Sequence, residues 1–508
     1  MNYYIGVDVG TTSTKAVLYD DQAHVLTTSK QGYTLYRDPS GMAEQDPDQL
    51  VAAVEKVIHD AAAQADLKQG QLLAVSFSSA NQSVILLDQD FHPQSRVMTW
   101  ADTRARKVAA KLKSSAQGKQ IYLKTGTPIH PMSPLTKLMW LHETDADKLE
   151  QAAYIGDIKS YLFYRLFGVF KVDISIASCT GMMNINSADW DPEALQLAHV
   201  QASQLPKIVA GTHQEVGLRH QAQVKMGIPA DTPFVYGAFD GALSNLGVGA
   251  LSQDTVAITI GTSAAVRVVT DHPVIDPQQR LFCYAVDNGL WVIGGPLNNG
   301  GDVFQWAVEH LVDASAVKNE GIDAYALANE VIANVPAGSY GLIFNPYLGG
   351  ERAPLWNANA RGSFFGLSQL HTRADMLRAV MEGICMNINS VFKAVRELVG
   401  EPKSVTATGG FAQSAVWKQM LADVLNCPVE IPQSFESGCL AAVVMAMKSI
   451  GQVKDLAIVD KFIGDKETYQ PDAAIAAVYQ QYQPVFEQVV TLLSPLYGRI
   501  TDLQQANS

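Results

Sequence analysis

The chain has 508 residues, of which 47% are apolar and 17% charged, a balance typical of a soluble globular protein with two or three domains. This balance excludes disordered, collagenous and coiled-coil proteins. The 37 basic and 50 acidic residues leave a net charge of −13, which disfavours nucleic acid and anionic membranes as partners.

The spacing of the cysteines and the lengths of the apolar runs indicate the cellular compartment of the protein. The five cysteines are widely spaced without a C-x-x-C pair, so we expect neither a disulfide framework nor a structural zinc site. The N-terminal residues lack the basic segment of a signal peptide. The longest apolar run, Cys439 to Met447, is far shorter than the roughly 20 residues that a membrane helix requires. We therefore predict a cytoplasmic protein without a membrane segment.

The N-terminal residues predict a β-hairpin. Two apolar segments within residues 5–18 flank a turn of Gly10, Thr11, Thr12 and Ser13. Glycine removes the Cβ that would keep a phosphate away from the backbone, and the turn adds N–H and hydroxyl donors. The tip is therefore a candidate phosphate site, and an ordinary hairpin with a hydroxyl-rich turn is the alternative.

Several regular elements are expected after this hairpin. Asp46-Pro47-Asp48 is a helix start signal. The expected elements are a helix at 49–65, strands at 72–78 and 83–87, a helix after the turn at 181–192, and a loop at 217–233.

Polar and aromatic residues after the first two of these strands form a candidate polyol site. They are Asn81, Gln82, Trp100, Asp102 and Arg104. An indole ring can contact the apolar face of a sugar, while amide, carboxylate and guanidinium groups bond its hydroxyls. A satisfied surface cluster is the alternative.

An apolar strand at residues 234–239 ends in Asp240. A carboxylate at the end of a strand can accept a proton from a substrate hydroxyl, so Asp240 is a candidate general base. The alternative is an ordinary N-cap for a helix from Ala242 onward.

Residues 257–269 repeat the first hairpin half a chain later, with Gly261 and Thr262 at the positions of Gly10 and Thr11. Asp8 corresponds to Thr259, so one copy alone brings the carboxylate that a phosphate-bound Mg²⁺ requires. Neither copy has a P-loop. We predict two domains, residues 1–248 and 249–508, whose tips grip one polyphosphate across a cleft.

The second half contains a further candidate phosphate or base contact. The expected elements are a helix at 373–399 ended by Gly400, a strand at 404–408, a helix at 412–425 and a buried helix at 439–450. Gly409 and Gly410, between the strand and the helix, offer bare backbone and a helix N-terminus to a ligand. A tight helix start is the alternative.

Two longer segments, with the duplicated hairpins and the Gly409-Gly410 turn, resemble the FGGY family of carbohydrate kinases in the actin-like ATPase superfamily. Residues 362–382 fit the family's second sequence pattern, and residues 132–144 fit its first except at Thr144. The resemblance implies an α/β fold with two actin-like, ribonuclease-H-like domains, each a mixed sheet with flanking helices, and a cleft between them.

Within this family the chain is most similar to the gluconokinases, in residues 125–135, 158–163 and 172–181. Gln82 stands where the xylulose and gluconate kinases commonly have histidine, so the identity of the sugar stays open.

The resemblance also implies roles for individual residues. Asp8 would organise Mg²⁺, and Asp240 would be the catalytic base. The residues matched to ATP contacts are Asp8, Gly10, Thr11, Thr12, Ser13, Lys15, Gly261, Thr262, Gly300, Gly301, Gly409, Gly410 and Ser414. Those matched to sugar contacts are Asn81, Gln82, Trp100 and Met132. Arg104 and Lys137 are the cations nearest these motifs, and we expect one of them to bind a substrate carboxylate, with a salt bridge as the alternative.

The implied reaction is ATP- and Mg²⁺-dependent phosphorylation of a primary hydroxyl of a sugar acid, with D-gluconate giving 6-phosphogluconate. The partner would be this small sugar or sugar acid, and a homodimer is left open. A kinase of the same family for xylulose, ribulose or glycerol is one alternative. A non-catalytic actin-like nucleotide switch is an alternative of a different class.

Overall fold

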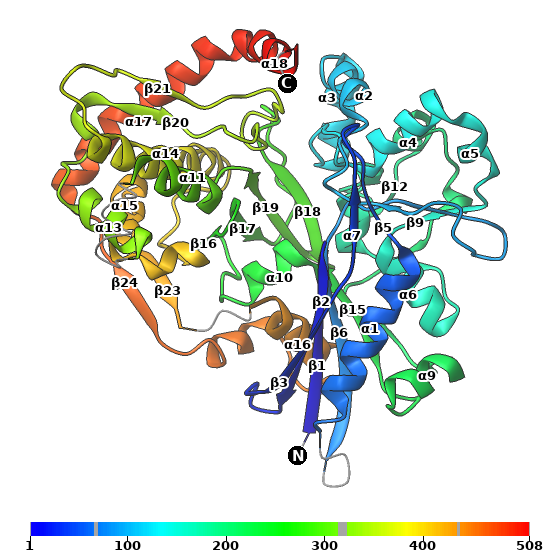
Figure 1. Ribbon diagram of the computed structural model, residues 1–508. Helices are drawn as coiled ribbons and strands as arrows, with labels where there is room; N and C mark the ends of the chain where they lie inside the picture. The colour runs from blue at the N-terminus through cyan, green and yellow to red at the C-terminus, as the bar shows by residue number, and fades with distance from the viewer. Residues whose placement is uncertain (1, 66–69, 313–322, 434–436, 507–508) are drawn as a thin grey trace. The chain divides into compact units, whose positions relative to one another are not determined.

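The computed structural model of the chain describes residues 2–65, 70–312, 323–433 and 437–506 (Figure 1). The chain forms two compact units. Unit 1 comprises Met1–Leu251, Val269–Val292 and Glu436–Gly464, and unit 2 comprises Ser252–Val268, Ile293–Phe435 and Asp465–Ser508. The domains expected at 1–248 and 249–508 stay a prediction.

Unit 1 contains one large sheet and several short ones. Its strands are β1 (Asn2–Val9), β2 (Ser13–Asp20), β3 (Val25–Gly32), β4 (Leu35–Arg37), β5 (Ala43–Gln45), β6 (Gln71–Ser79), β7 (Ile85–Leu87), β8 (Val97–Met98), β9 (Tyr154–Gly156), β10 (Lys171–Asp173), β11 (Met183–Asn184), β12 (Asp189–Trp190), β13 (Lys207–Val209), β14 (Gln214–Glu215), β15 (Phe234–Phe239) and β18 (Phe282–Asp287).

The helices of unit 1 surround this sheet and extend beyond it. They are α1 (Pro47–Ala62), α2 (Arg106–Lys113), α3 (Ala116–Thr125), α4 (Pro134–Thr144), α5 (Ala146–Gln151), α6 (Ile158–Phe167), α7 (Ile174–Ser178), α8 (Pro192–Ala198), α9 (His220–Met226), α10 (Asp240–Leu246) and α16 (Ser437–Ser449), with the 3₁₀ turns η1 (Ala202–Gln204) and η4 (Leu456–Lys461).

The main sheet of unit 1 has the strand order β14-β15-β6-β1-β2-β3. β1 pairs antiparallel with β2, to which a short turn joins it, and parallel with β6, which the chain reaches after α1. β15 also pairs parallel with β6. The parallel strands therefore end at one edge of the sheet, where Asp8, Ser79 and Asp240 stand.

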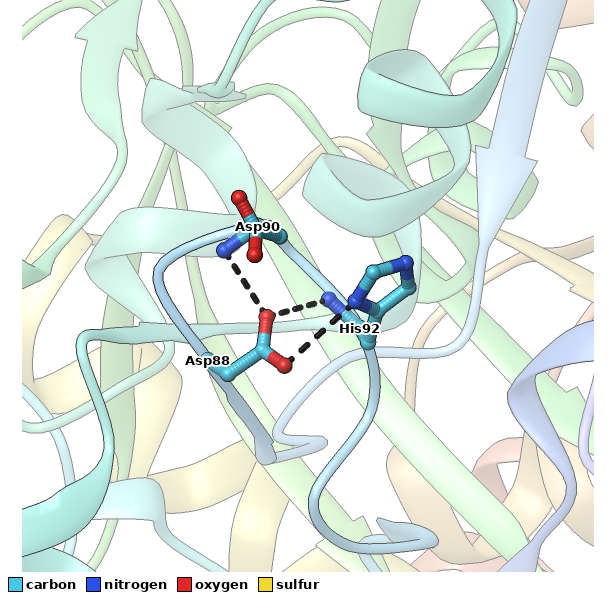
Figure 2. Close-up of side chains that lie close together, drawn as sticks. All are labelled: Asp88, Asp90 and His92. Atoms are coloured by element: carbon cyan, nitrogen blue, oxygen red, sulfur yellow. Dashed lines mark hydrogen bonds and ion pairs between the residues drawn. The ribbon is translucent and has the colours of Figure 1, made fainter.

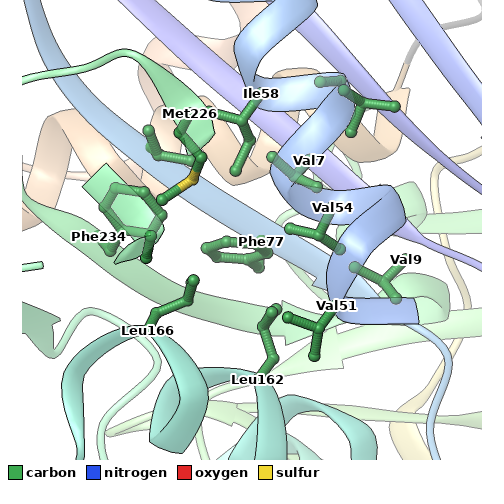
Figure 3. Close-up of a cluster of buried hydrophobic side chains, with 14 of the residues drawn as sticks. Val7, Val9, Val51, Val54, Ile58, Phe77, Leu162, Leu166, Met226 and Phe234 are labelled. Carbon is green, nitrogen blue, oxygen red and sulfur yellow. The ribbon is translucent and has the colours of Figure 1, made fainter. Parts of the chain in front are cut away.

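Successive residues of β1 face opposite sides of the sheet. Val7 and Val9 belong to a buried cluster with Val54 of α1 and Phe77 of β6 (Figure 3). Gly6 faces α16, and a Cβ there would overlap the carbonyl oxygen of Cys439. The two faces of the sheet are thus covered by different helices, and the strand ends are fixed between them.

Unit 2 contains most of the second large sheet. Its strands are β16 (Thr255–Ile260), β17 (Ala264–Thr270), β19 (Leu290–Leu297), β20 (Ile343–Asn345), β21 (Ser363–Phe365), β22 (Ser404–Thr408), β23 (Val429–Pro432) and β24 (Lys466–Tyr469). The strand order of the large sheet is β18-β19-β17-β16-β22-β23-β24. The residues of β17 and β19 within Val269–Val292 are counted with unit 1, as is β18. The helices of unit 2 are α11 (Gly301–Leu311), α13 (Ala324–Ala333), α14 (Arg373–Val399), α15 (Ala415–Leu425), α17 (Ala473–Leu493) and α18 (Tyr497–Ala506), with the 3₁₀ turns η2 (Ser339–Gly341), η3 (Gly410–Gln413) and η5 (Ser494–Leu496).

The sheet of unit 2 repeats the pairing of unit 1. β16 pairs antiparallel with β17 and parallel with β22, and β22 pairs parallel with β23. The order β17-β16-β22-β23 thus has the same directions as β2-β1-β6-β15. The predicted duplication of a mixed sheet with flanking helices is confirmed.

The predicted loop at 217–233 is wrong in part, because His220–Met226 forms α9. This helix is only seven residues long, and no side chain caps its N-terminus, so it lacks a start signal. The helix expected at 412–425 begins later, at Ala415, after the 3₁₀ turn η3. Among the described residues, no helix is both long enough and apolar enough to cross a membrane.

Candidate active site

The first hairpin tip lies between β1 and β2. Gly10 N–H donates to Ser13 O at 3.0 Å, which closes the turn. The Thr11 carbonyl and hydroxyl accept bonds from Gln45 Nε2 at 2.6 Å and from Trp100 Nε1 at 2.8 Å. Within the described part of the chain, no group accepts the backbone N–H of Thr11 or Thr12. Gln45 and Trp100 therefore hold the tip in place through Thr11, and the N–H groups of Thr11 and Thr12 can donate to an anion.

Asp8 stands at the end of β1, half-buried, opposite Lys15 in the ladder with β2. Its Oδ1 accepts a hydrogen bond from Ser78 Oγ at 2.7 Å. Tyr33 Oη donates to the Gly10 carbonyl at 2.5 Å, and burial, with a smaller contribution from Asp8, raises the pKa of Tyr33 far above its ordinary value. Tyr33 is thus a permanent donor here, and the half-buried Asp8 carboxylate suits a hard divalent cation.

The second hairpin differs from the first by one residue. In unit 1 the last pair, Val9 with Thr14, encloses four residues, whereas in unit 2 Ile260 with Ala264 encloses three. Gly261 N–H again closes the turn, onto Ser263 O at 2.9 Å. The residue-by-residue correspondence of the two hairpins therefore holds along the first strand and is shifted by one residue along the second.

Gly300 and Gly301, at the start of α11, lie against the second tip. Gly301 N–H donates to Gly261 O at 2.7 Å, and Asp302 N–H donates to Thr262 O at 3.1 Å. A Cβ on Gly300 would approach the carbonyl carbon of Ser263 to 2.7 Å. These glycines thus allow the helix N-terminus and the hairpin tip to pack backbone to backbone.

Gly409 and Ser414 are placed near the same strand end. Gly409 has φ +115°, and a Cβ there would overlap the carbonyl oxygen of Ile260, whereas Gly410 has nothing within 4 Å of such a Cβ. Ser414 is the N-cap of α15, since its hydroxyl accepts from Trp417 N–H at 3.1 Å, and it donates to Asn329 Oδ1 at 2.7 Å. The tight helix start is therefore present, and the exposed Gly410 backbone stays open to a ligand.

The predicted sugar residues lie in unit 1. Trp100 is 37% exposed, and Asn81 is half-buried. Gln82 and Met132 are buried, and Gln82 Nε2 lies 3.2 Å from Tyr284 Oη. Sequence reasoning missed Tyr284, because it lies 202 residues from Gln82 and stands in no recognised motif.

Lys137 is buried beneath these residues. Its ammonium donates to the backbone carbonyls of Gln82, at 2.6 Å, and Met132, at 2.8 Å. Burial lowers the pKa of Lys137 to about 7, and the charge of Arg104 adds to the effect. The lysine thus joins two predicted sugar-contact segments through their backbone.

Arg104 lies in an ion-pair network. Its Nε and Nη2 donate to Asp102, and Nη2 also pairs with Glu44 at 2.5 Å. The guanidinium stands 4.7 Å from the ring centre of Trp140. The salt bridge that was the alternative for Arg104 is therefore present, while Nη1 bonds to no described residue.

Asp240 is the first residue of α10, directly after β15, and is half-buried. The N-cap is Phe239, so Asp240 is not the N-cap that was its alternative role. Its Oδ1 accepts from Gly241 N–H at 2.6 Å. The Cys179 sulfur accepts a hydrogen bond from Asn81 Nδ2 at 3.2 Å. Burial raises the pKa of the Cys179 thiol, and the charges of Asp173 and Asp240 raise it further. Asp240, Cys179 and Asn81 therefore lie in one neighbourhood.

The predicted site residues thus form two groups. In unit 1 the structure brings together the first tip with Trp100, and the Asp240 strand end with Asn81. In unit 2 it brings together the second tip, Gly300, Gly301 and Gly409.

An acidic turn outside both groups contains Asp88, Asp90 and His92 (Figure 2). The Asp88 carboxylate accepts from the backbone N–H of Asp90 at 2.8 Å and of His92 at 2.9 Å. These bonds are those of an aspartate-stabilised turn and account for the arrangement without a metal ion.

Comparison with known proteins relates the whole chain to sugar kinases. Models of the FGGY family of carbohydrate kinases match twice, the N-terminal domain at residues 3–247 and the C-terminal domain at residues 256–450. A gluconokinase of Bacillus subtilis (strain 168) is 41% identical over 509 residues, which is 99% of this chain and 98% of the relative.

Two solved structures are similar over almost their full length. A gluconate kinase from Lactobacillus acidophilus has a TM-score of 0.94 and 38% identity, covering 98% of this chain and 99% of that chain. A ligand-bound xylulose kinase from the same organism has the same TM-score and identity, covering 98% and 100%.

Proposed function

The chain belongs to the FGGY family of carbohydrate kinases, and we propose that it transfers the γ-phosphoryl group of ATP to the primary hydroxyl of D-gluconate, which gives 6-phosphogluconate. The observation that carries this proposal is the 41% identity with a gluconokinase over 99% of the chain. A second candidate substrate is D-xylulose, because a structural relative of equal similarity is named a xylulose kinase.

Asp240 is proposed as the general base. A sugar hydroxyl is a weak nucleophile at neutral pH, so a carboxylate within hydrogen-bond reach must accept its proton as the bond to phosphorus forms. Asp240 is half-buried at the end of β15, and its neighbourhood contains Asn81, a proposed sugar contact. Asn81, Gln82, Trp100 and Met132 would hold the sugar so that its terminal hydroxyl meets this carboxylate.

Each hairpin tip is proposed to bind phosphate groups of the nucleotide. Thr11 and Thr12 offer N–H groups that no described residue accepts. Ser13 of the tip and Lys15, which stands opposite Asp8 on β2, are the further proposed contacts. Asp8 would hold Mg²⁺, which when bound neutralises charge on the phosphates. In unit 2 the proposed nucleotide contacts are Gly261, Thr262, Gly300, Gly301, Gly409, Gly410 and Ser414.

Arg104 is proposed to contact the carboxylate of gluconate. Its Nη1 edge bonds to no described residue, and its side chain is 18% exposed. Lys137 is less suited to this contact, because it is 1% exposed and its amine donates to two backbone carbonyls. The N–H donors of Nη1 can form a charge-assisted hydrogen bond with a substrate carboxylate.

The proposal is tested by ADP release with ATP, Mg²⁺ and a panel of D-gluconate, D-xylulose, D-ribulose and glycerol. We expect gluconate to give the highest kcat/KM by at least tenfold. A preference for a ketose would assign the second substrate, and slow turnover indifferent to every sugar would indicate a nucleotide switch instead. The five cysteines are free and buried, which supports a reducing compartment such as the cytoplasm.

A further inference from the structure

The strand that carries Asp240 is irregular just before its end. β15 pairs with β6 through Val235 and Ser76, and then through Ala238 and Ser78. Two residues of β15 therefore stand opposite the single residue Phe77, which is a β-bulge. A bulge interrupts the ladder, bends its strand and changes the direction in which the following residues point.

Gly237 makes this bulge. Its φ is +67°, and a Cβ there would overlap the carbonyl oxygen of Phe77. Its N–H donates to Gly211 O at 2.9 Å, outside the ladder with β6. The bulge thus interrupts the ladder between β15 and β6 at Tyr236 and Gly237.

The ammonium of Lys159 binds backbone carbonyls on both sides of Gly237. Lys159 is on α6, and its Nζ donates to Tyr236 O at 3.0 Å and to Ala238 O at 3.4 Å. It also pairs with Asp173 Oδ2 at 2.8 Å, and the two side chains are 1% and 0% exposed. A buried ammonium needs a counter-ion and acceptors for its N–H donors. Here Asp173 is the counter-ion, and the carbonyls of Tyr236 and Ala238 are the acceptors.

Asp173 and Ser175 extend this contact to the residue before Asp240. Asp173 caps α7 by accepting from Ile176 N–H at 3.0 Å, which fixes the helix that carries Ser175. Ser175 Oγ accepts from Phe239 N–H at 3.0 Å. Three of the last four residues of β15, Tyr236, Ala238 and Phe239, are therefore bonded to side chains from α6 and α7.

From this geometry we infer that Lys159, Asp173 and Ser175 form a bulge clamp, a set of positioning residues that sets the location of the Asp240 carboxylate for proton transfer. The inference rests on the proposed function, in which Asp240 is the general base. Lys159, Asp173 and Ser175 lie in two of the segments in which the chain resembles the gluconokinases, residues 158–163 and 172–181. Misplacing a catalytic group by about 1 Å can slow a reaction about a hundredfold.

The test uses the full chain and measures kcat, the KM for gluconate and ATP, and the melting temperature. The principal variant is Lys159→Met with Asp173→Asn, which removes both charges together and leaves no buried charge uncompensated. Ser175→Ala is a milder second variant that removes only the acceptor of Phe239 N–H. Val54→Ala, in the core of the same unit, is the control for lost stability (Figure 3).

We expect kcat to fall about tenfold or more in the double variant and about threefold in Ser175→Ala, with both KM values within about twofold of wild type. Val54→Ala should lower the melting temperature and leave kcat unchanged. An unchanged kcat in a folded double variant, or in Ser175→Ala if the double variant does not fold, would overturn the clamp. An equal loss of kcat in Val54→Ala would do the same.

Repeating the clamp variants in an Asp240→Asn background separates positioning from general damage. If the clamp acts through the Asp240 carboxylate, it should cause no further loss once that carboxylate is absent. An additive loss in both backgrounds would contradict the clamp. If the wild type phosphorylates another sugar but not gluconate, the proposed substrate alone is wrong. The clamp is then tested with that other sugar.

Discussion

The indole N–H of Trp100 donates to Thr11 Oγ1 at 2.8 Å, so the aromatic residue of the proposed sugar site is bonded to the tip of the first hairpin, the proposed phosphate site. The two residues are 89 positions apart in the chain. The contact joins the proposed acceptor site to the proposed donor site within unit 1.

This bond predicts different effects for two substitutions of Trp100. Trp100→Phe keeps an aromatic face for the sugar but loses the N–H, so kcat should fall about fivefold, equivalent to about 1 kcal/mol, with little change in the KM for gluconate. Trp100→Ala should also raise that KM. Steady-state kinetics of both variants decide the point, and identical behaviour of the two would contradict the separate roles of ring and N–H.

Lys137 predicts a pH-dependent stability. Its pKa is lowered by burial from 10.5 to about 7, so between these values the folded chain binds fewer protons than the unfolded chain. Stability should therefore rise with pH across this window by up to about 1.4 kcal/mol per pH unit from this residue. The melting temperature of wild type minus that of Lys137→Met should increase from pH 7 to pH 9. A constant difference would show that Lys137 keeps an ordinary pKa.

Arg104 predicts a charge-selective change in affinity. Arg104→Lys keeps a cation beside Asp102 and Glu44 but removes the Nη1 edge, so the KM for gluconate should rise about tenfold. The KM or inhibition constant of neutral D-xylulose should change less than twofold. Equal changes for the two sugars would place Arg104 in the ion-pair network alone.

Alanine substitutions at Gly409 and Gly410 form a matched pair of variants. Gly409→Ala places a Cβ at φ +115° against the Ile260 carbonyl, so it should lower the melting temperature and weaken ATP binding together. Gly410→Ala meets nothing within 4 Å and should leave the melting temperature unchanged. A raised KM for ATP in Gly410→Ala would then reflect a nucleotide contact, whereas an unchanged KM would remove Gly410 from the proposed site.

Long, strongly patterned elements could be predicted from the sequence. The helix Arg373–Val399 and the strand Ser404–Thr408 have the expected bounds, because a sustained apolar period and a terminal glycine specify them locally. The duplicated hairpins were likewise recognisable from short patterns. The seven-residue α9 was missed because it has no capping side chain.

The side-chain contacts of the site could not be predicted in this way. Arg104 meets Glu44 across 60 positions, and Gln82 meets Tyr284 across 202. The carbonyls that Lys159 binds flank a bulge, which only the register of β15 with β6 reveals. Such contacts follow from tertiary packing, which no local period encodes.

The most direct measurement of the central claim is the rate of ADP formation by wild type and by Asp240→Asn, with and without D-gluconate. The wild-type rate should depend on gluconate, and Asp240→Asn should lower kcat about a hundredfold or more while the KM for gluconate stays within a few-fold. Full gluconate-dependent turnover in Asp240→Asn, or a wild-type rate that ignores gluconate, would contradict the account.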